Sequence, residues 1–217
     1  MTINIAIDGP SGAGKSSISN ILAEKLNFVH LDTGAMYRSV AYAALKRNIS
    51  LEDENTVVDM ILKLDLKMKP DGTIICDGED ITKKIREPHM SMAASNVSKL
   101  KEVRAALVKM QQRIASNKGY ILDGRDIGTV VLKDAEVKIF LTAYPEERAK
   151  RRVLQNEKNG IKTDYQTIYD EIVARDYQDS HRENSPLKKA DDAIEIDSSN
   201  MSIDDVVNEV LKYVNNK

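Results

Sequence analysis

The segment at residues 9–17 reads Gly-Pro-Ser-Gly-Ala-Gly-Lys-Ser-Ser and satisfies the phosphate-loop pattern G-x-x-x-x-G-K-[ST]. An apolar run at residues 3–7 comes directly before this segment, and residues 16–26 carry helical spacing directly after it. A strand, a glycine-rich turn and a helix in this order direct several backbone N–H groups towards one anion. The chain is therefore expected to adopt an α/β fold and to bind the phosphates of a nucleoside triphosphate.

The residue types within this loop suit that role. Gly9, Gly12 and Gly14 let the backbone approach phosphate oxygens where a Cβ atom would collide. Lys15 supplies a positive charge, and the hydroxyl of Ser16 is a candidate ligand for Mg²⁺. The residues expected to contact the triphosphate are Gly9, Pro10, Ser11, Gly12, Ala13, Gly14, Lys15, Ser16 and Ser17.

The rest of the chain alternates between strand and helix patterns. Buried parallel strands are predicted at residues 3–7, 120–122, 137–141 and 193–196, with a weaker one at 28–31. Helices are predicted at residues 33–47, 100–116, from Pro145 towards Gly160, 164–182 and 203–214. This alternation predicts a three-layer α/β fold.

One stretch departs from this alternation. Residues 66–69 and 73–76 have a period of two and flank a Pro70-Asp71-Gly72 turn, which predicts an antiparallel hairpin, and a further turn follows at 77–80. Residues 156–164 are polar and contain a glycine, so a loop between two helices is expected there.

Composition restricts the partners. The 217 residues carry a formal net charge of −2, which argues against a duplex nucleic acid or an anionic membrane. No apolar run approaches the ~18 residues of a membrane span, and no signal peptide is expected before the first strand. Cys76 is the only cysteine, which suits the cytoplasm. A monomer is the default expectation, and His30, His89 and His181 are expected to be structural or solvent-facing.

Two arginine groups flank the predicted loop at residues 156–164. They are Arg148, Arg151 and Arg152 before it, and Arg175 and Arg182, with Asp179 between them, after it. A solvated surface is the ordinary interpretation of such charges. In a chain that binds a polyphosphate, however, arginines beside a loop favour closure over a transferring phosphoryl group, where they stabilise charge and exclude water.

Acidic and basic residues also follow two predicted strands. Asp123 and Arg125 come after the strand at 120–122, at the end of the strand where α/β sheets bind ligands. Asp123 is a candidate for Mg²⁺, and Arg125 for a phosphate, although a capped turn is the alternative. Asp32 or Thr33 is predicted to cap the helix that carries Arg38.

Three segments together identify a family resemblance. Residues 7–16 (Ile-Asp-Gly-Pro-Ser-Gly-Ala-Gly-Lys-Ser), 31–38 (Leu-Asp-Thr-Gly-Ala-Met-Tyr-Arg) and 123–131 (Asp-Gly-Arg-Asp-Ile-Gly-Thr-Val-Val) resemble the bacterial cytidylate kinases, which are nucleoside-monophosphate kinases. The likeness extends nearly end to end. Many enzymes share the first segment, but the combination is far more specific. Ser17 stands where many relatives have threonine, and either residue supplies a hydroxyl.

The resemblance implies transfer of the γ-phosphoryl group of ATP to CMP or dCMP, with Mg²⁺, in pyrimidine nucleotide metabolism. It implies one domain over residues 1–217 with the P-loop NTPase fold, a five-stranded parallel core sheet, a small antiparallel insert and a helical lid. The core would comprise residues 1–32, 105–147 and 183–217, the CMP-binding region 33–104, and the lid 148–182.

By the same resemblance, a set of polar residues would hold CMP. Arg38, Arg125 and Arg182 would bind its phosphate or sugar side, Ser95, Arg104 and Asp126 the cytosine edge, and Arg175 and Asp179 the ribose, with Asp32 and Thr33 also in the site. The residues expected to act in catalysis are Lys15, Arg125, Arg148 and Arg152. A carboxylate such as Asp126 accepts from the amino group of cytosine, whereas uracil reverses that edge.

Two alternatives stay open at this point. The first is another phosphate-loop kinase with a different acceptor, such as AMP, shikimate or gluconate. The second is a nucleotide-dependent switch protein, which usually recognises guanine through Asn-Lys-x-Asp after a core strand. The nearest match here, Asn156-Glu157-Lys158-Asn159, lies in the expected lid and lacks the aspartate.

Overall fold

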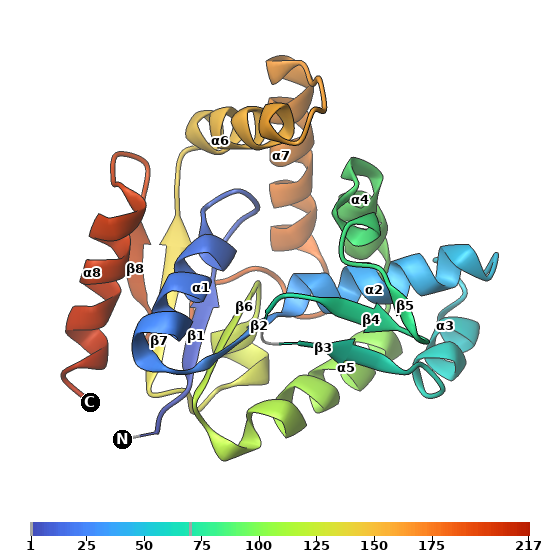
Figure 1. The fold of residues 1–217 in the computed structure, drawn as a ribbon, viewed down its shortest axis with the longest axis horizontal. Coiled ribbons are helices and arrows are strands. Elements are labelled where there is room, and N and C mark those ends of the chain that lie inside the picture. Colours follow the sequence, from blue (N-terminus) through green and yellow to red (C-terminus); the bar gives the residue numbers. More distant parts are fainter. Residues whose placement is uncertain (1, 70) are drawn as a thin grey trace.

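A computed structural model describes residues 2–69 and 71–217 of the chain (Figure 1). Its centre is a five-stranded parallel sheet with the strand order β2-β6-β1-β7-β8. The strands are β1 (Ile5–Asp8), β2 (Val29–Asp32), β6 (Tyr120–Gly124), β7 (Val137–Thr142) and β8 (Ile194–Asp197). All five predicted strands are therefore confirmed, and the weakest of them, β2, lies at the edge of the sheet.

Helices cover both faces of this sheet and extend beyond its upper edge (Figure 1). They are α1 (Lys15–Leu26), α2 (Thr33–Lys46), α3 (Glu54–Ile61), α4 (Pro88–Val97), α5 (Lys101–Ile114), α6 (Pro145–Lys158), α7 (Tyr165–His181) and α8 (Ile203–Val214). Alternate side chains of β1 separate the two faces: Ile5 and Ile7 pack with α1 and α8, whereas Ala6 packs with α2. The predicted three-layer fold is confirmed.

The largest differences from the prediction lie between residues 47 and 100. Helix α3, which has eight residues, was not predicted; Asp53 caps it by accepting from the backbone N–H of Thr56. Helix α4, which begins at Pro88, was not predicted either. Helix α6 continues to Lys158, so residues 156–158 are helical rather than part of the expected loop.

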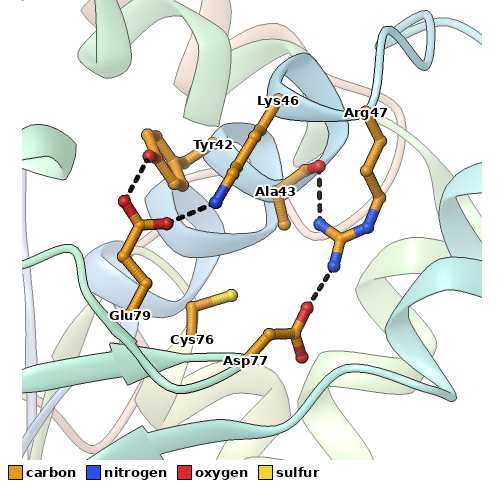
Figure 2. Close-up of a pocket in the computed structure, with 7 residues that line it drawn as sticks. All are labelled: Tyr42, Ala43, Lys46, Arg47, Cys76, Asp77 and Glu79. Carbon is orange, nitrogen blue, oxygen red and sulfur yellow. Dashed lines mark hydrogen bonds and ion pairs between the residues drawn. The ribbon is translucent and has the colours of Figure 1, made fainter.

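The predicted hairpin forms part of a second, antiparallel sheet of three strands, β3 (Leu66–Met68), β4 (Ile74–Cys76) and β5 (Glu79–Asp80). Pro70, in the predicted turn, lies outside the described residues. Strand β5 occupies part of the segment where only a turn was expected. Figure 2 shows how side chains of α2 face this sheet around a cavity of about 230 Å³. For example, Nζ of Lys46 on α2 lies 2.6 Å from Oε2 of Glu79 on β5. This ion pair connects the small sheet to α2.

Hydrophobic packing divides into three clusters. One lies between α2, α3, α4, α5 and one face of the large sheet, and a second lies between the other face, α1 and α8. The third is small and contains Ala149, Ile168 and Ile172 from α6 and α7. Among the described residues, no helix combines the length and apolarity that crossing a bilayer requires.

Gly9 is the glycine on which the fold depends most directly. Its φ is 150°, and a Cβ atom there would lie 1.9 Å from the carbonyl oxygen of Leu141 in the neighbouring strand. We expect Gly9→Ala to lower the free energy of unfolding by more than about 3 kcal/mol, because a backbone atom cannot move aside cheaply. Gly78→Ala is the matched control, since Gly78 also has a positive φ, 81°, but open space around it.

The control should cost only about 1 kcal/mol, the penalty of a left-handed alanine. Urea denaturation followed by circular dichroism measures both variants. An equal loss in the two proteins would contradict the packing argument for Gly9.

Candidate active site

The glycine-rich loop joins the end of β1 to the first turn of α1. Gly14, at φ 97°, is the N-cap of α1, and no side chain caps this helix. The first N–H groups of α1 therefore point towards the loop without a protein partner, an arrangement that attracts anions. The predicted strand, turn and helix are all present around residues 9–17.

Lys15 lies folded over this loop. Only 6% of its surface is exposed, and its ammonium group donates to the carbonyl oxygen of Pro10 at 2.7 Å. Burial, with a further contribution from Arg125, holds its pKa well below the usual value for lysine. A buried, poorly compensated cation of this kind is stabilised when phosphate oxygens arrive.

Ser16 and Asp123, the two candidates for Mg²⁺, are brought together. The hydroxyl of Ser16 donates to Asp123 Oδ2 at 2.9 Å. The other carboxylate oxygen, Oδ1, lies 2.5 Å from His30 Nε2. Burial raises the pKa of Asp123, but His30 and Lys15 outweigh burial, so the pKa is lowered overall and the carboxylate stays ionised. In the described part of the chain, no three His, Cys, Asp or Glu residues form a metal-binding group.

His30 is a residue that sequence reasoning missed, because one histidine without ligand spacing carries no local signal. Burial disfavours its charged form, yet Asp123 outweighs burial and raises its pKa. The contact between His30 and Asp123 depends on the pairing of β2 with β6. In this register Asp32, two residues after His30, lies opposite Asp123.

Asp8 links the phosphate loop to the segment after β6. Its two carboxylate oxygens accept from the backbone N–H groups of Ile127 and Gly128, both at 2.7 Å. These residues begin a π-helical turn, Ile127–Val131, that follows Asp126 directly. Asp8 therefore positions the segment that carries Arg125 and Asp126, another role that sequence reasoning missed.

Four of the predicted arginines are close neighbours in the fold, namely Arg38, Arg125, Arg152 and Arg175. Arg182 joins this arginine cluster beside Arg104, near Asp126 and Asp179. Burial and then Arg125 lower the pKa of Arg175 to about 9, and burial and then Arg104 lower that of Arg182 to about 10. Burial, Arg38 and Arg125 lower the pKa of Arg152. The protein alone does not fully compensate these charges.

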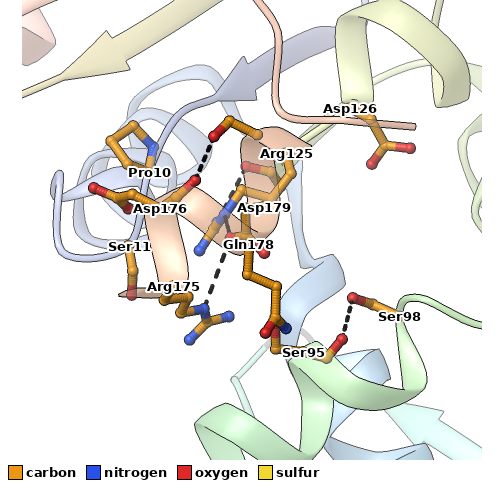
Figure 3. A network of polar contacts seen from close by, with 12 residues as sticks. Pro10, Ser11, Ser95, Ser98, Arg125, Asp126, Arg175, Asp176, Gln178 and Asp179 are labelled. Atoms are coloured by element: carbon orange, nitrogen blue, oxygen red, sulfur yellow. Dashed lines mark hydrogen bonds and ion pairs between the residues drawn. The ribbon is translucent and has the colours of Figure 1, made fainter. Parts of the chain in front are cut away.

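Acidic side chains of the fold hold the cluster in place but do not neutralise it. Asp179 accepts from Arg125 Nε at 2.8 Å and lies 3.7 Å from Arg175 Nε (Figure 3). Buried polar atoms without a hydrogen-bond partner remain on Arg38, Arg104, Arg175, Arg182 and Asp126. An unpaired polar group is costly when it is buried, and unpaired donors on several neighbouring arginines indicate a site for an anionic ligand.

Arg148 and Arg152, one turn apart on α6, have different surroundings. Arg148 bonds only to protein: Nε to the carbonyl of Ala143, Nη1 to that of Ser11 and Nη2 to Asp176. It thus ties α6 and α7 to the phosphate loop. Arg152 makes one long contact of 3.4 Å to Ser11 Oγ and otherwise faces the arginine cluster. Arg151 bonds to Ser198, in the loop before α8, and its Nη1 also lies 3.5 Å from the carbonyl oxygen of Ala13 in the phosphate loop.

Asp126 has one engaged and one unpaired oxygen. Oδ1 pairs with Arg104 Nη2 at 2.7 Å, whereas Oδ2 is buried without a partner. The side chains of both residues are nearly fully buried, at 6% and 5% exposure. A buried carboxylate oxygen without a donor is the group that an amino group of a ligand would satisfy.

Helices α4 and α7 meet beside this pair. Gln178 donates to Ser95 Oγ, and Arg175 donates to Ser91 Oγ, so two residues of α7 bond to two residues of α4. Figure 3 shows Gln178 directed at Ser95, on the same side of α7 as Arg175. The hydroxyl of Ser95, expected at the cytosine edge, is thus engaged by the protein.

Asp32 and Thr33 lie at the same sheet edge but are already bonded. Asp32 caps α2 by accepting from the N–H of Ala35 at 2.8 Å and pairs with Arg38 at 2.9 Å. Thr33 donates to the backbone carbonyl of Asp123 at 2.7 Å. Asp32 and Thr33 therefore hold the start of α2, Arg38 and the end of β6 in place. Ser17, the last residue of the predicted loop, is exposed on α1.

A glycine loop at a helix N-terminus, a buried lysine and an arginine cluster together define a P-loop phosphotransferase. A family profile described as "Cytidylate kinase" matches residues 5–216. The cytidylate kinase of Caldicellulosiruptor bescii is 55% identical over 213 residues, covering 97% of this chain and 94% of that protein. The cytidylate kinase of Bacillus subtilis is 45% identical over 218 residues, covering 99% and 97%. The chain therefore belongs to the cytidylate kinase family.

A crystal structure of an uncharacterized protein from Eubacterium ventriosum has a similar fold, with a TM-score of 0.55, 15% sequence identity and complete coverage of both chains. At this identity the likeness concerns the fold alone.

The buried carboxylate of Asp8 predicts a pH dependence of stability. Burial raises its pKa to about 6 from 3.8, outweighing the two N–H donors that favour the ionised form. The folded protein thus keeps this proton to a higher pH than the unfolded chain. Protonated Asp8 therefore contributes about 3 kcal/mol to the free energy of unfolding below about pH 4. This contribution is lost as the pH rises through 6.

Asp8→Asn removes this titration, although it also replaces one acceptor by a donor at every pH. We expect the difference in unfolding free energy, wild type minus variant, to fall by about 2.5 kcal/mol between pH 4 and pH 7.5, because the unfolded carboxyl is already partly ionised at pH 4. Urea titrations at four pH values measure it. A difference that does not change with pH would contradict the raised pKa.

Proposed function

We propose that this protein transfers the γ-phosphoryl group of ATP to CMP or dCMP, forming CDP or dCDP and ADP. The observation that carries the proposal is the arginine cluster between the phosphate loop and the unpaired oxygen of Asp126. It offers one site for a polyphosphate and another for a base with an amino group, with cations between them. Membership of the cytidylate kinase family supports the same activity.

The donor would bind with its phosphates over the glycine loop. The N–H groups of the loop and of the first turn of α1 would donate to the β- and γ-phosphates, and Lys15 would leave the carbonyl of Pro10 to reach them. The hydroxyl of Ser16 and the ionised carboxylate of Asp123 are oxygen ligands of the kind that Mg²⁺ prefers, so the residues fit this ion. When bound, Mg²⁺ neutralises charge on the transferring phosphates.

Transfer requires an oxygen of the acceptor phosphate to attack the γ-phosphorus while the bond to the β–γ bridging oxygen breaks. Charge then spreads over the equatorial oxygens of the moving group. We assign Arg125 and Arg152 to these oxygens, and Arg38 and Arg182 to the acceptor phosphate. Arg148 would act by fixing the loop through the carbonyl of Ser11, since all three nitrogens of its guanidinium group donate to protein acceptors.

The base would be read at the Asp126–Arg104 pair. The unpaired Oδ2 of Asp126 would accept from the amino group of cytosine, and Arg104 would donate to an acceptor of the ring. Ser95 can join this readout as a donor, because its oxygen accepts from Gln178 and its hydroxyl proton has no acceptor among the bonds observed in the described residues. Arg175 and Asp179 would contact the ribose, beside Arg125.

We also propose the division of the chain into a core, an acceptor-binding region at 33–104 and a lid at 148–182. The separate cluster of Ala149, Ile168 and Ile172 supports a lid that moves as a unit. The boundary at residue 104 falls within α5, so this helix would belong to both neighbouring parts. We further propose a cytoplasmic monomer, a setting compatible with the free, buried thiol of Cys76.

A coupled assay of ADP release across nucleoside monophosphates tests the activity. With MgATP as donor we expect kcat/KM for CMP and dCMP to exceed that for UMP and AMP by at least about tenfold, because a mismatched edge leaves buried groups unpaired. Shikimate and gluconate should give no turnover above the ATPase background. Faster reaction with AMP or UMP would overturn the proposed acceptor.

Replacing the carboxylate of Asp126 by an uncharged amide tests whether this residue recognises the base. Asp126→Asn should lower kcat/KM for CMP by about 10- to 100-fold, the value of a charged hydrogen bond, while KM for ATP changes little. The preference for CMP over UMP should shrink with it. Asp204→Asn, at an exposed position on α8, is the matched control. An unchanged CMP-to-UMP ratio in Asp126→Asn would show that another group reads the base.

A further inference from the structure

His30 makes two polar contacts at the edge of the sheet. Its Nε2 lies 2.5 Å from Oδ1 of Asp123, and its Nδ1 lies 2.7 Å from Oδ1 of Asn20. The side chains of His30 and Asp123 are 11% and 5% exposed, so the contact between them is largely shielded from water. None of the roles assigned above uses this histidine.

The contact determines how the Asp123 carboxylate is turned. A carboxylate rotates easily about its last bond unless both oxygens have partners. Here Oδ1 is held by His30 and Oδ2 by the hydroxyl of Ser16. His30 thereby directs Oδ2 towards the phosphate loop, where the cation of the triphosphate is expected.

His30 is itself held in place by two elements. Its strand, β2, pairs with β6, with His30 opposite Ile121 in the register. Its second contact, Asn20, stands four residues after Ser16 on α1, so both side chains project from one face of that helix. Helix α1 therefore supports both partners of the Asp123 carboxylate, the hydroxyl directly and the imidazole through Asn20.

We propose that His30 is a positioning residue for the divalent cation that accompanies the nucleotide. By holding Oδ1 of Asp123, it keeps Oδ2 and the hydroxyl of Ser16 aimed at the cation. Hydrogen bonds to a ligating carboxylate commonly change metal affinity about 10- to 100-fold. The proposal rests on the proposed function in one respect, the assignment of Ser16 and Asp123 to Mg²⁺.

The test measures ADP binding by calorimetry, first in EDTA and then with increasing Mg²⁺. His30→Leu should raise the Mg²⁺ concentration that gives half of the Mg²⁺-dependent tightening by about tenfold or more. Affinity for ADP in EDTA should stay within about twofold, because the loop itself is unchanged. His30→Gln, whose Nε2 can still donate to Asp123, should restore the Mg²⁺ dependence to within about threefold.

Two further variants keep the experiment decisive. Asn20→Ala removes the support of His30 from an exposed position and should shift the Mg²⁺ dependence in the same direction by a smaller factor, even where His30→Leu does not fold. His89→Leu replaces a histidine that is 63% exposed on α4 and should change nothing.

The result that overturns the proposal is a Mg²⁺ dependence in His30→Leu and Asn20→Ala equal to that of the wild type. An equal loss of ADP affinity with and without Mg²⁺ would also overturn it, since this indicates a purely structural role. If ADP binding to the wild type did not depend on Mg²⁺, the assignment of Ser16 and Asp123 to the cation would itself be wrong. The assay with nucleoside monophosphates reports separately on the proposed function, because it compares acceptors on the wild-type protein and uses no variant of His30.

Discussion

The structure is organised around repulsion between cations that one edge of a parallel sheet brings together. Arg125 and Arg175 lie on either side of Asp179, and both lower the pKa of other cations nearby. Burial adds to the cost, because the charges cannot be shielded by water. The protein holds this arrangement through rigid elements and a few carboxylates, so that most of the compensation is left to bound phosphates. Catalysis of phosphoryl transfer needs such preorganised charge more than any covalent participation.

The scaffold delivers these groups because parallel strands place all their carboxyl ends at one edge. Asp8, Asp32 and Asp123 end, or nearly end, three neighbouring strands, and the register sets Asp32 opposite Asp123 and Asp8 opposite Gly124. Each carboxylate then orders a different part of the site. Asp8 holds the turn after β6, Asp32 holds Arg38, and Asp123 holds Ser16. The site is therefore connected to the core of the fold through carboxylates at the ends of its strands.

The sequence predicted the parts of this arrangement that depend on local patterns. Apolar runs located all five core strands, and the glycine loop identified the anion site because its spacing follows directly from backbone geometry. Helices α3 and α4 were missed, since one is short and the apolar stripe of the other, Met90, Ala93, Ala94 and Val97, is half alanine. The contacts of Asp8 with Ile127 and of His30 with Asp123 span 119 and 93 positions of sequence, which no local pattern encodes.

In the candidate site as well, local patterns in the sequence predicted the residues but not their surroundings in the fold. That Arg148 and Arg152 share a helix face was readable from their spacing, but their different surroundings were not. Arg148 anchors the phosphate loop, whereas Arg152, one turn later on α6, faces the arginine cluster, and this difference depends on tertiary packing. Spacing on a helix therefore predicted the shared face but not the surroundings of each residue.

Two side-chain bonds join α7 to α4, from Gln178 to Ser95 and from Arg175 to Ser91. In the division of the chain proposed above, they link the proposed lid to the proposed acceptor-binding region. The hydroxyl of Ser95 accepts from Gln178 and keeps its own proton, so it can donate to a cytosine acceptor while this bond persists. Arg175 likewise has an unpaired Nε beside the group that bonds to Ser91. In the proposed site, a cytidine nucleotide would therefore add bonds to both helices at once, which favours the arrangement in which α4 and α7 are in contact.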